Sequence, residues 1–265
     1  MTMYLADSLN KDSGNKSVSK TLTILSTFDE MTPIQRTSDI ATKLNMHIST
    51  VSRHLNTLLD WGFLERDDAT GFYYPGFKIV ALAGAALQNN DAFRYAHAEL
   101  PKLSSKYNIH SHMGIPRQGD IIHLIDSCCE NTIDLLMPMG HRHPMYCCAM
   151  GRAILAFLPK SEMNDILKNS DRCKHAPATK TDIDEIVQDL ARVKRRGYSV
   201  VVNELNEGVG SLAAPVFDRN HTPIAAISVS ASAHSFSRLE REQELAKAVM
   251  GAAGKISSKL GYYPR

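Results

Sequence analysis

The 265-residue sequence contains no apolar run near the ~20 residues that a membrane-spanning helix requires. Its first twenty residues also lack the basic start and apolar core of a signal peptide. These absences exclude an integral membrane protein and predict a cytoplasmic location with no membrane partner. With 43% hydrophobic and 22% charged residues, the chain has the composition of a globular protein of one or two domains.

The sequence also lacks an excess of either charge. The formal net charge is +2, and residues 1–90 carry eight basic and nine acidic side chains, a net charge of −1. A strongly basic nucleic-acid-binding surface spread over the whole first third is therefore excluded. Any interaction with a nucleic acid must depend on where individual charges lie.

Cysteine is scarce, odd in number and partly paired in sequence. The five cysteines are Cys128, Cys129, Cys147, Cys148 and Cys173. Neighbouring cysteines rarely bridge each other, because the geometry is strained. The pattern indicates free thiols in a reducing compartment rather than a disulfide framework.

The stretch "HISTVSRHLNTLL", residues 47–59, has the periodicity of an amphipathic helix. One stripe is apolar, with Val51, Leu55, Leu58 and Leu59 at helical spacing. The opposite face carries hydroxyls, one amide and one guanidinium, and within these residues it holds no carboxylate. An ordinary solvated helix face usually mixes both charge signs, so the pattern indicates a face that contacts a partner, and an ordinary solvated face is the alternative.

The surrounding residues predict a helix-turn-helix with a β-hairpin behind it. A helix is expected from Lys16, with an apolar stripe of Val18, Leu22, Leu25 and Phe28. A second helix over 37–46 would have Thr37 as N-cap, and the turn at Asn45–Met46 lacks the glycine often found there. Short strands over 63–66 and 71–74 surround the turn "DDATG". This order is that of a winged helix-turn-helix, whose second helix enters a DNA major groove.

The rest of the chain mixes helices and strands. Helices are expected over 78–88, 91–107, 148–158, 181–197 and 237–260, and strands over 108–116, 121–128, 132–140, 198–202, 211–217 and 223–231. Thr181 and Asp184 have capping-box spacing, and Gly197 can end that helix. The predicted class is α+β with a mostly antiparallel sheet.

Several segments together resemble the IclR family of bacterial transcriptional regulators. They are "SVSKTLTIL", "STVSRHLNTLLDWGFLERD", "YYPGFKIVALAGAAL", "GHRHPMYCCAMGRAILAFLP", "RRGYSVVVNELNEGVGSLAAPVFD", "PIAAISVSA" and "KISSKLGYY". The segments, taken together in this order and spacing, cover roughly residues 16–262. Where the family commonly has "GKALL", this chain has "GRAIL" with Arg152, and its wing tip carries Asp67 and Asp68, a poor surface for phosphates.

The resemblance implies a ligand-responsive regulator of a catabolic operon, expected to be a repressor, that binds a palindromic DNA operator as a homodimer or tetramer. It implies a winged helix-turn-helix domain (16–77), a dimerising linker helix (78–92) and a GAF-like effector-binding domain (93–265), while the polar composition of residues 1–15 predicts a disordered tail. Regulators of sugar-acid catabolism look most similar. No cofactor, metal or catalytic residue is expected.

Ten side chains are candidates for DNA contact. Arg53 is the first choice for reading a base, since a guanidinium can bind guanine O6 and N7 together. The others on the polar helix could read bases or hold phosphates, and the basic side chains near helix starts are phosphate candidates. The set is Ser49, Thr50, Ser52, Arg53, Asn56, Thr57, Lys16, Lys20, Arg36 and Lys43.

The predicted effector site combines a helix start with strand hydroxyls. Backbone N–H groups at a helix start attract anions, and Ser228 and Ser230 share one strand face. Together these donors suit a small carboxylate, such as a sugar, hydroxy or keto acid. The resemblance adds the region near Glu204. The set is Ala149, Met150, Gly151, Ser211, Ser228, Ser230, Cys148 and Glu204.

Two alternatives remain open from the residues. Cys147 and Cys148, close to His141 and His143, could form a metal or thiol sensor, although their spacing matches no strong zinc signature. Cys147 or Cys148 could also serve a Cys-His hydrolase, although no nucleophile elbow is present. Small buried thiols that shape the pocket wall are the simpler interpretation.

Overall fold

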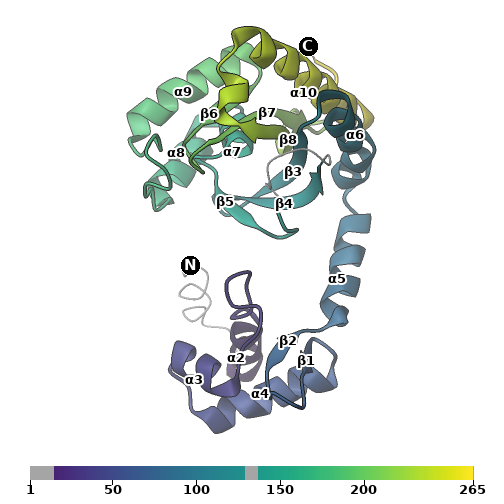
Figure 1. The fold of residues 1–265 in the computed structure, drawn as a ribbon, viewed down its shortest axis with the longest axis vertical. Helices are drawn as coiled ribbons and strands as arrows, with labels where there is room; N and C mark the ends of the chain where they lie inside the picture. Colours follow the sequence, from purple (N-terminus) through teal and green to yellow (C-terminus); the bar gives the residue numbers. More distant parts are fainter. Residues whose placement is uncertain (1–14, 129–136, 265) are drawn as a thin grey trace. The chain divides into compact units, whose positions relative to one another are not determined.

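The computed structural model describes residues 15–128 and 137–264 and divides the chain into two compact units that meet between Asn89 and Asn90 (Figure 1). The predicted tail, 1–15, lies outside the described residues except for Asn15. Most of the predicted strand 132–140 also lies outside them, and its described part, 137–140, forms no strand. Every helix in the described ranges is too short or too polar to span a lipid bilayer.

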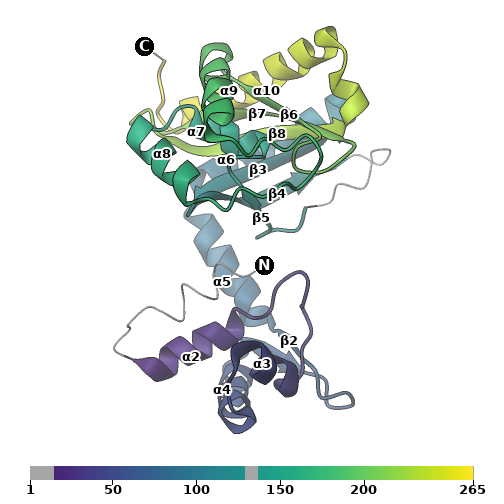
Figure 2. The same cartoon turned by 90° about the vertical axis from the view of Figure 1, so that its left-hand side faces the viewer.

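The first unit is a winged helix-turn-helix followed by one further helix (Figure 2). Its elements are α2 (Lys16–Leu25), α3 (Thr37–Leu44), α4 (Ile48–Asp60), β1 (Leu64–Arg66), β2 (Tyr73–Pro75) and α5 (Phe77–Gln88). The apolar stripe of α4 meets α2, α3 and β1 in a small core around Ile24, Ile40, Val51 and Leu55. The predicted fold of this part is therefore confirmed.

The predicted apolar stripe of α2 is wrong for Val18 and Leu22, whereas Leu25 and Phe28 pack against the core as expected. Val18 and Leu22 are more than half exposed, whereas Ile24 is fully buried and Leu25 and Phe28 are half-buried. The core-facing side of α2 contains polar groups, because Thr21 Oγ1 lies 2.8 Å from Nδ1 of a buried histidine on α4. Such a side chain is invisible to a pattern that counts only apolar residues.

Two predicted helix caps are displaced by one residue. Helix α3 takes Arg36 as its N-cap rather than Thr37, because the Asp39 carboxylate accepts the backbone N–H of Arg36 at 3.1 Å. Asp182, rather than Thr181, caps α9 by accepting the N–H of Glu185 at 2.9 Å. In both helices, an aspartate carboxylate that accepts a backbone N–H determines where the helix begins.

The turn between α3 and α4 uses Asn45 where a glycine was noted as missing. Asn45 takes the left-handed conformation, with φ of 51°, and its N–H bonds back to the end of α3. Asparagine adopts this conformation more readily than other non-glycine residues. The helix-turn-helix therefore closes without glycine.

The second unit is built on one antiparallel sheet. Its elements are α6 (Asp91–Tyr107), β3 (His110–Arg117), β4 (Asp120–Ser127), β5 (Arg142–Pro144), α7 (Ala149–Leu155), α8 (Lys160–Asn169), α9 (Ile183–Arg196), β6 (Ser199–Val202), β7 (Val209–Phe217), β8 (Pro223–Ser232), the 3₁₀ turn η1 (Ala233–Phe236) and α10 (Leu239–Lys259). The strand order is β5-β4-β3-β8-β7-β6, and every described pair is antiparallel. Helix α8 was not predicted.

Helices cover both faces of this sheet (Figure 1). Helices α6 and α10 bury one face around Leu100, Ile227 and Val249. Helix α7, with α9 behind it, covers the other face around Ile154 and Ala226. Because strand side chains alternate between faces, Ser228 and Ser230 point to the α7 face while Ile227 and Val229 point to the other.

Candidate DNA-binding surface and effector pocket

The polar face of α4 is accessible in the first unit. Ser49, Arg53, Asn56 and Thr57 are exposed, and Thr50 and Ser52 are half-buried. The helix continues to Asp60, which shares the stripe of Ser49, Arg53 and Asn56 at its C-terminal end. The carboxylate-free part of the face is thus its N-terminal three turns, the part that contacts base edges in helix-turn-helix proteins.

The four predicted phosphate contacts differ in how they are held. Lys16 and Lys20 are exposed on α2. The Arg36 guanidinium lies 4.5 Å from the ring centre of Phe72 on the hairpin. Lys43 is engaged inside the unit, since its ammonium donates to Thr27 O at 3.1 Å. That contact gives Lys43 a structural role within the unit.

The acidic wing tip has a local structural cause. The Asp67 carboxylate accepts the backbone N–H groups of Ala69 and Thr70, at 2.8 and 3.3 Å, and so closes the hairpin turn. Hydrogen bonds from Thr70 and Ala69 lower the pKa of this carboxyl below its usual value. Asp67 therefore serves the turn.

The second unit contains a cavity of about 50 Å³ on the α7 face of the sheet. One water requires roughly 10–15 Å³ on this measure, so only a small ligand fits. Its lining is His112, His123, Met137, His143, Cys148, Ala149, Met150, Val201, Leu205, Asn206, Val209, Ser211, Ser228 and Ser230. Six of the eight predicted effector residues lie here, and Gly151 and Glu204 do not.

Strand register explains how distant residues meet in this cavity. Ser211 on β7 is the direct partner of Ser230 on β8, and their hydroxyl oxygens are 2.8 Å apart. Across β3 and β8, His112 is the partner of Ser228. Direct cross-strand partners share a face, so β7, β8 and β3 present these groups side by side.

The N-cap and the first two residues of α7, Cys148, Ala149 and Met150, line one part of the cavity. Cys148 is the N-cap, and its sulfur accepts the N–H of Gly151 at 3.3 Å. A Cβ on Gly151 would lie 2.3 Å from both Cα and O of Met145, so only glycine allows this close approach. Gly151 therefore lets α7 approach Met145 closely without lining the cavity itself. Its N–H already donates to the Cys148 sulfur.

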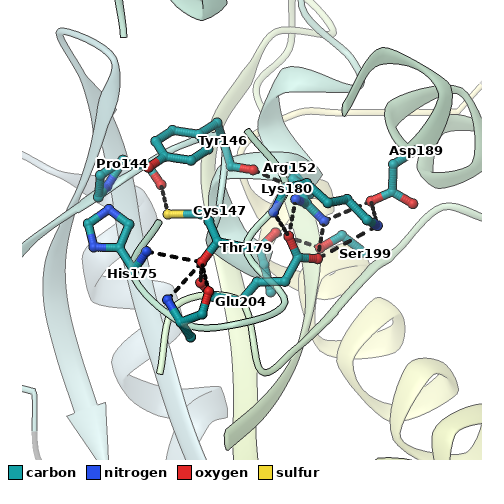
Figure 3. A network of polar contacts seen from close by, with 12 residues as sticks. Pro144, Tyr146, Cys147, Arg152, His175, Thr179, Lys180, Asp189, Ser199 and Glu204 are labelled. Atoms are coloured by element: carbon teal, nitrogen blue, oxygen red, sulfur yellow. Dashed lines mark hydrogen bonds and ion pairs between the residues drawn. The ribbon is translucent and has the colours of Figure 1, made fainter. Parts of the chain in front are cut away.

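The side chain of Arg152 leaves the cavity and forms a buried ionic network (Figure 3). The guanidinium is fully buried and binds both carboxylate oxygens of Glu204, at 2.7 and 2.5 Å. It also donates to Asp189 at 2.9 Å and to Tyr146 O at 2.8 Å. Glu204, expected at the effector, instead fixes α7 to the β6–β7 loop.

The predicted effector set missed eight of the fourteen residues that line the cavity. Three of these are the histidines His112, His123 and His143, of which only His143 was considered, in the metal-sensor alternative. They lie on β3, β4 and β5 and are at least nine-tenths buried. Burial, with neighbouring imidazoles, lowers the pKa of His123 to about 2 and that of His143 to about 3. The available signal was the alternation "HSH" at 110–112 and "HRH" at 141–143, which places both histidines of each pair on one strand face.

The two thiols at the start of α7 are chemically quiet. Burial raises the pKa of Cys148 to about 12 and raises the pKa of Cys147 far above its usual range. A thiol rather than a thiolate is a poor nucleophile and a poor metal ligand. No group of histidine, cysteine and acidic side chains suited to a metal ion occurs among the described residues. The thiol-based alternatives are not favoured.

Comparisons with known proteins agree along almost the whole chain. The IclR helix-turn-helix domain matches residues 17–68, and the bacterial transcriptional regulator IclR C-terminal domain matches residues 84–258. The HTH-type transcriptional regulator KdgR of Escherichia coli (strain K12) is 32% identical, covering 93% of each chain. The HTH-type transcriptional repressor AllR of Salmonella typhi is 24% identical, covering 95% of this chain and 92% of its own. The crystal structure of Thermotoga maritima IclR is similar, with a TM-score of 0.75, 27% identity and coverage of 93% of this chain and 99% of that one. The chain therefore belongs to the IclR family of bacterial transcriptional regulators.

Proposed function

We propose that this regulator is a repressor of a catabolic operon, has no enzymatic activity, and responds to a small carboxylic acid. The observation that carries the proposal is the hydroxyl-lined cavity in one unit combined with the carboxylate-free start of an exposed helix in the other. A regulator named as a repressor among the relatives supports the direction of control. Because the protein acts on DNA, we infer a cytoplasmic location.

Operator recognition is assigned to α4, with Arg53 reading a base. The side chain is exposed and lies between Ser49 and Asn56 on the helix face. Arg53→Ala should weaken operator binding by roughly 1–3 kcal/mol and relax base preference at one position. Gel-shift titration against operator variants measures this.

Arg53→Lys is the matched variant, because it keeps the charge and loses the bidentate fork. Loss of specificity in both variants supports base readout. Full recovery by lysine would reduce Arg53 to a phosphate contact, and unchanged affinity in both would remove α4 from the interface.

Dimerisation is assigned to α5. The helix is rich in apolar residues yet contains no buried residue, and Phe77, Val80 and Leu82 are at least half exposed. An exposed apolar helix favours a partner surface. A dimer would double the DNA reader and requires a palindromic operator. Light scattering at micromolar concentration should give at least twice the 29.3 kDa chain mass, and a monomer that binds one half-site tightly would contradict this.

The carboxylate of the effector is assigned to the hydroxyls of Ser211, Ser228 and Ser230 and to the start of α7. Converging O–H and N–H donors can hold a carboxylate without a cationic side chain. Arg152 does not line the cavity, since Glu204 and Asp189 bind its guanidinium.

Ser228→Ala combined with Ser230→Ala should abolish effector binding and leave operator binding intact. Calorimetry with a panel of hydroxy, keto and sugar acids tests this, and Ser258→Ala, an exposed serine on α10, is the control. If the double variant binds the best acid as well as the wild type, the carboxylate is held elsewhere. If only uncharged molecules bind, the proposed effector class is wrong.

A further inference from the structure

The lining of the effector cavity has two chemically different halves. Ser211, Ser228 and Ser230 occupy β7 and β8, while the histidine wall, His112, His123 and His143, occupies β3, β4 and β5. The strand order β5-β4-β3-β8-β7 keeps the halves next to each other without mixing them. A ligand that covers both halves must therefore have two different ends.

In the described part of the chain, His123 is the member of the histidine wall that combines burial with two unpartnered ring nitrogens. It is 4% exposed, lines the cavity, and neither ring nitrogen has a hydrogen-bond partner among the described residues. Its nearest ring neighbours are His143 and His112, with ring centres 4.9 and 5.7 Å away in edge-to-face arrangements. Buried polar atoms are almost always paired, so this imidazole points to a polar occupant of the cavity.

His112 has a defined orientation because of Asp126. Its Nδ1 lies 2.9 Å from Asp126 Oδ1, behind the wall. Burial alone would raise the pKa of Asp126, but its hydrogen bond and charge interaction with His112 bring that pKa below the usual value. The Asp126 carboxylate, close to Nδ1, therefore holds the orientation of the His112 ring.

The charge of the wall also disfavours an anion. Burial keeps His123 and His143 neutral at pH 7, because it lowers their pKa values to about 2 and about 3. The titratable groups around them are His112, His110, His141, His175, Asp126 and Cys148. With the Cys148 thiol protonated, the charge beside the wall is the negative one on Asp126, 2.9 Å from His112 Nδ1.

We propose that the histidine wall selects an effector whose far end is an uncharged hydroxyl, so that the ligand is a hydroxylated monocarboxylate and not a dicarboxylate. This inference rests on the proposed function, in which the serine half holds the single carboxylate. A hydroxyl can donate to the unprotonated nitrogen of the neutral His123 ring and can also accept from an imidazole N–H, whereas a carboxylate can only accept.

Three acids with one carbon skeleton test the far end by calorimetry on the full-length protein. Glycerate carries a hydroxymethyl group, lactate a methyl group and tartronate a second carboxylate at the same position. Gluconate and glucarate repeat the comparison on a longer chain. We expect the hydroxymethyl acid to bind about tenfold or more tightly than either analogue, because a site that pairs a hydroxyl rejects ligands without it.

Variants of His123 assign the preference to the wall. His123→Phe should erase the preference for glycerate over lactate while keeping lactate affinity within about threefold, and His123→Asn, which restores a donor and an acceptor, should recover part of it. His97→Phe, at an exposed position on α6, is the control. Glycerate affinity should stay within about twofold between pH 6 and 8, because burial keeps His123 and His143 neutral.

Three results would overturn the inference while leaving the proposed function standing. They are tartronate or glucarate binding as tightly as its monoacid, His123→Phe weakening glycerate and lactate equally, and uptake of nearly one proton on glycerate binding. Failure of every acid to bind, with binding of the neutral glycerol, would instead overturn the proposed effector class and the inference with it.

Discussion

The two units place their candidate functional side chains in opposite environments. In the first unit, Arg53 and Asn56 stand exposed on one helix, and the apolar stripe behind them builds the core. In the second, serines and histidines from five strands meet in a buried cavity. In a surface site a side chain can be substituted without disturbing the fold, whereas in a buried site the functional residues are also part of the core. Function and stability should therefore separate in the first unit and remain coupled in the second.

The largest expected effect is in the buried network of the second unit. Arg152→Met should destabilise that unit by about 3–5 kcal/mol, because the buried carboxylates of Glu204 and Asp189 would lose their buried cationic partner and keep the more exposed Lys180 and Arg192. Chemical unfolding followed by circular dichroism measures the loss. The single tryptophan, Trp61, lies in the first unit, so its fluorescence should report an unchanged transition there.

Arg192→Met is the matched control for that measurement. Arg192 also binds Asp189, at 2.9 Å, but its side chain is half exposed. Its removal should cost no more than about 1 kcal/mol, as is usual for exposed ion pairs. Equal losses in the two variants, or a parallel shift of the Trp61 transition, would contradict the separation of the units.

Acidification should also affect the second unit more. His123 and His143 have folded-state pKa values near 2 and 3, below the unfolded value of 6.5. The stability that depends on their neutral form is complete above pH 6.5 and is lost as the pH falls through 6.5 toward those lower values. Two such groups can remove up to about 4 kcal/mol between pH 7 and pH 5.

Denaturant titrations at several pH values, with the Trp61 and circular dichroism signals compared, measure that loss. In the first unit, burial followed by the charges of Arg53 and Lys20 lowers the pKa of His54. The Trp61 transition should consequently move less. A pH-independent second unit would mean that its histidines are not buried neutral groups in solution.

The comparison also explains what the sequence could reveal. Helix α4 has its apolar residues at helical spacing, so Val51 and Leu55 identified the buried side and Arg53 the exposed one. Ser228 and Ser230 were found the same way, by strand alternation. Such local periodicity fixes which face a residue occupies, and it served well in both units.

The missed features depend on pairing between distant segments. His112 reaches Ser228 only because β3 pairs with β8, more than a hundred residues away in the chain. Glu204 joins Arg152 through the β6–β7 loop, and neither partner marks the other in sequence. The error on α2 had another cause, since Val18 and Leu22 are apolar yet exposed. Apolar residues are not always inside, so a stripe needs its packing partner to be assigned.

The smallest expected effect tests the separation within the first unit itself. Lys43 and Lys20 were both predicted as phosphate contacts, yet Lys43 donates to Thr27 O at 3.1 Å and to Thr32 Oγ1 at 3.2 Å, whereas Lys20 is exposed. Lys43→Met should destabilise the first unit by about 1 kcal/mol, through loss of charged hydrogen bonds that are partly screened by solvent. Lys20→Met should leave the Trp61 transition in place and lower the salt dependence of operator binding by about one counterion per protomer. If Lys43→Met instead lowered the salt dependence without moving the Trp61 transition, Lys43 would be a DNA contact, and burial within the unit would be a poor guide to its role.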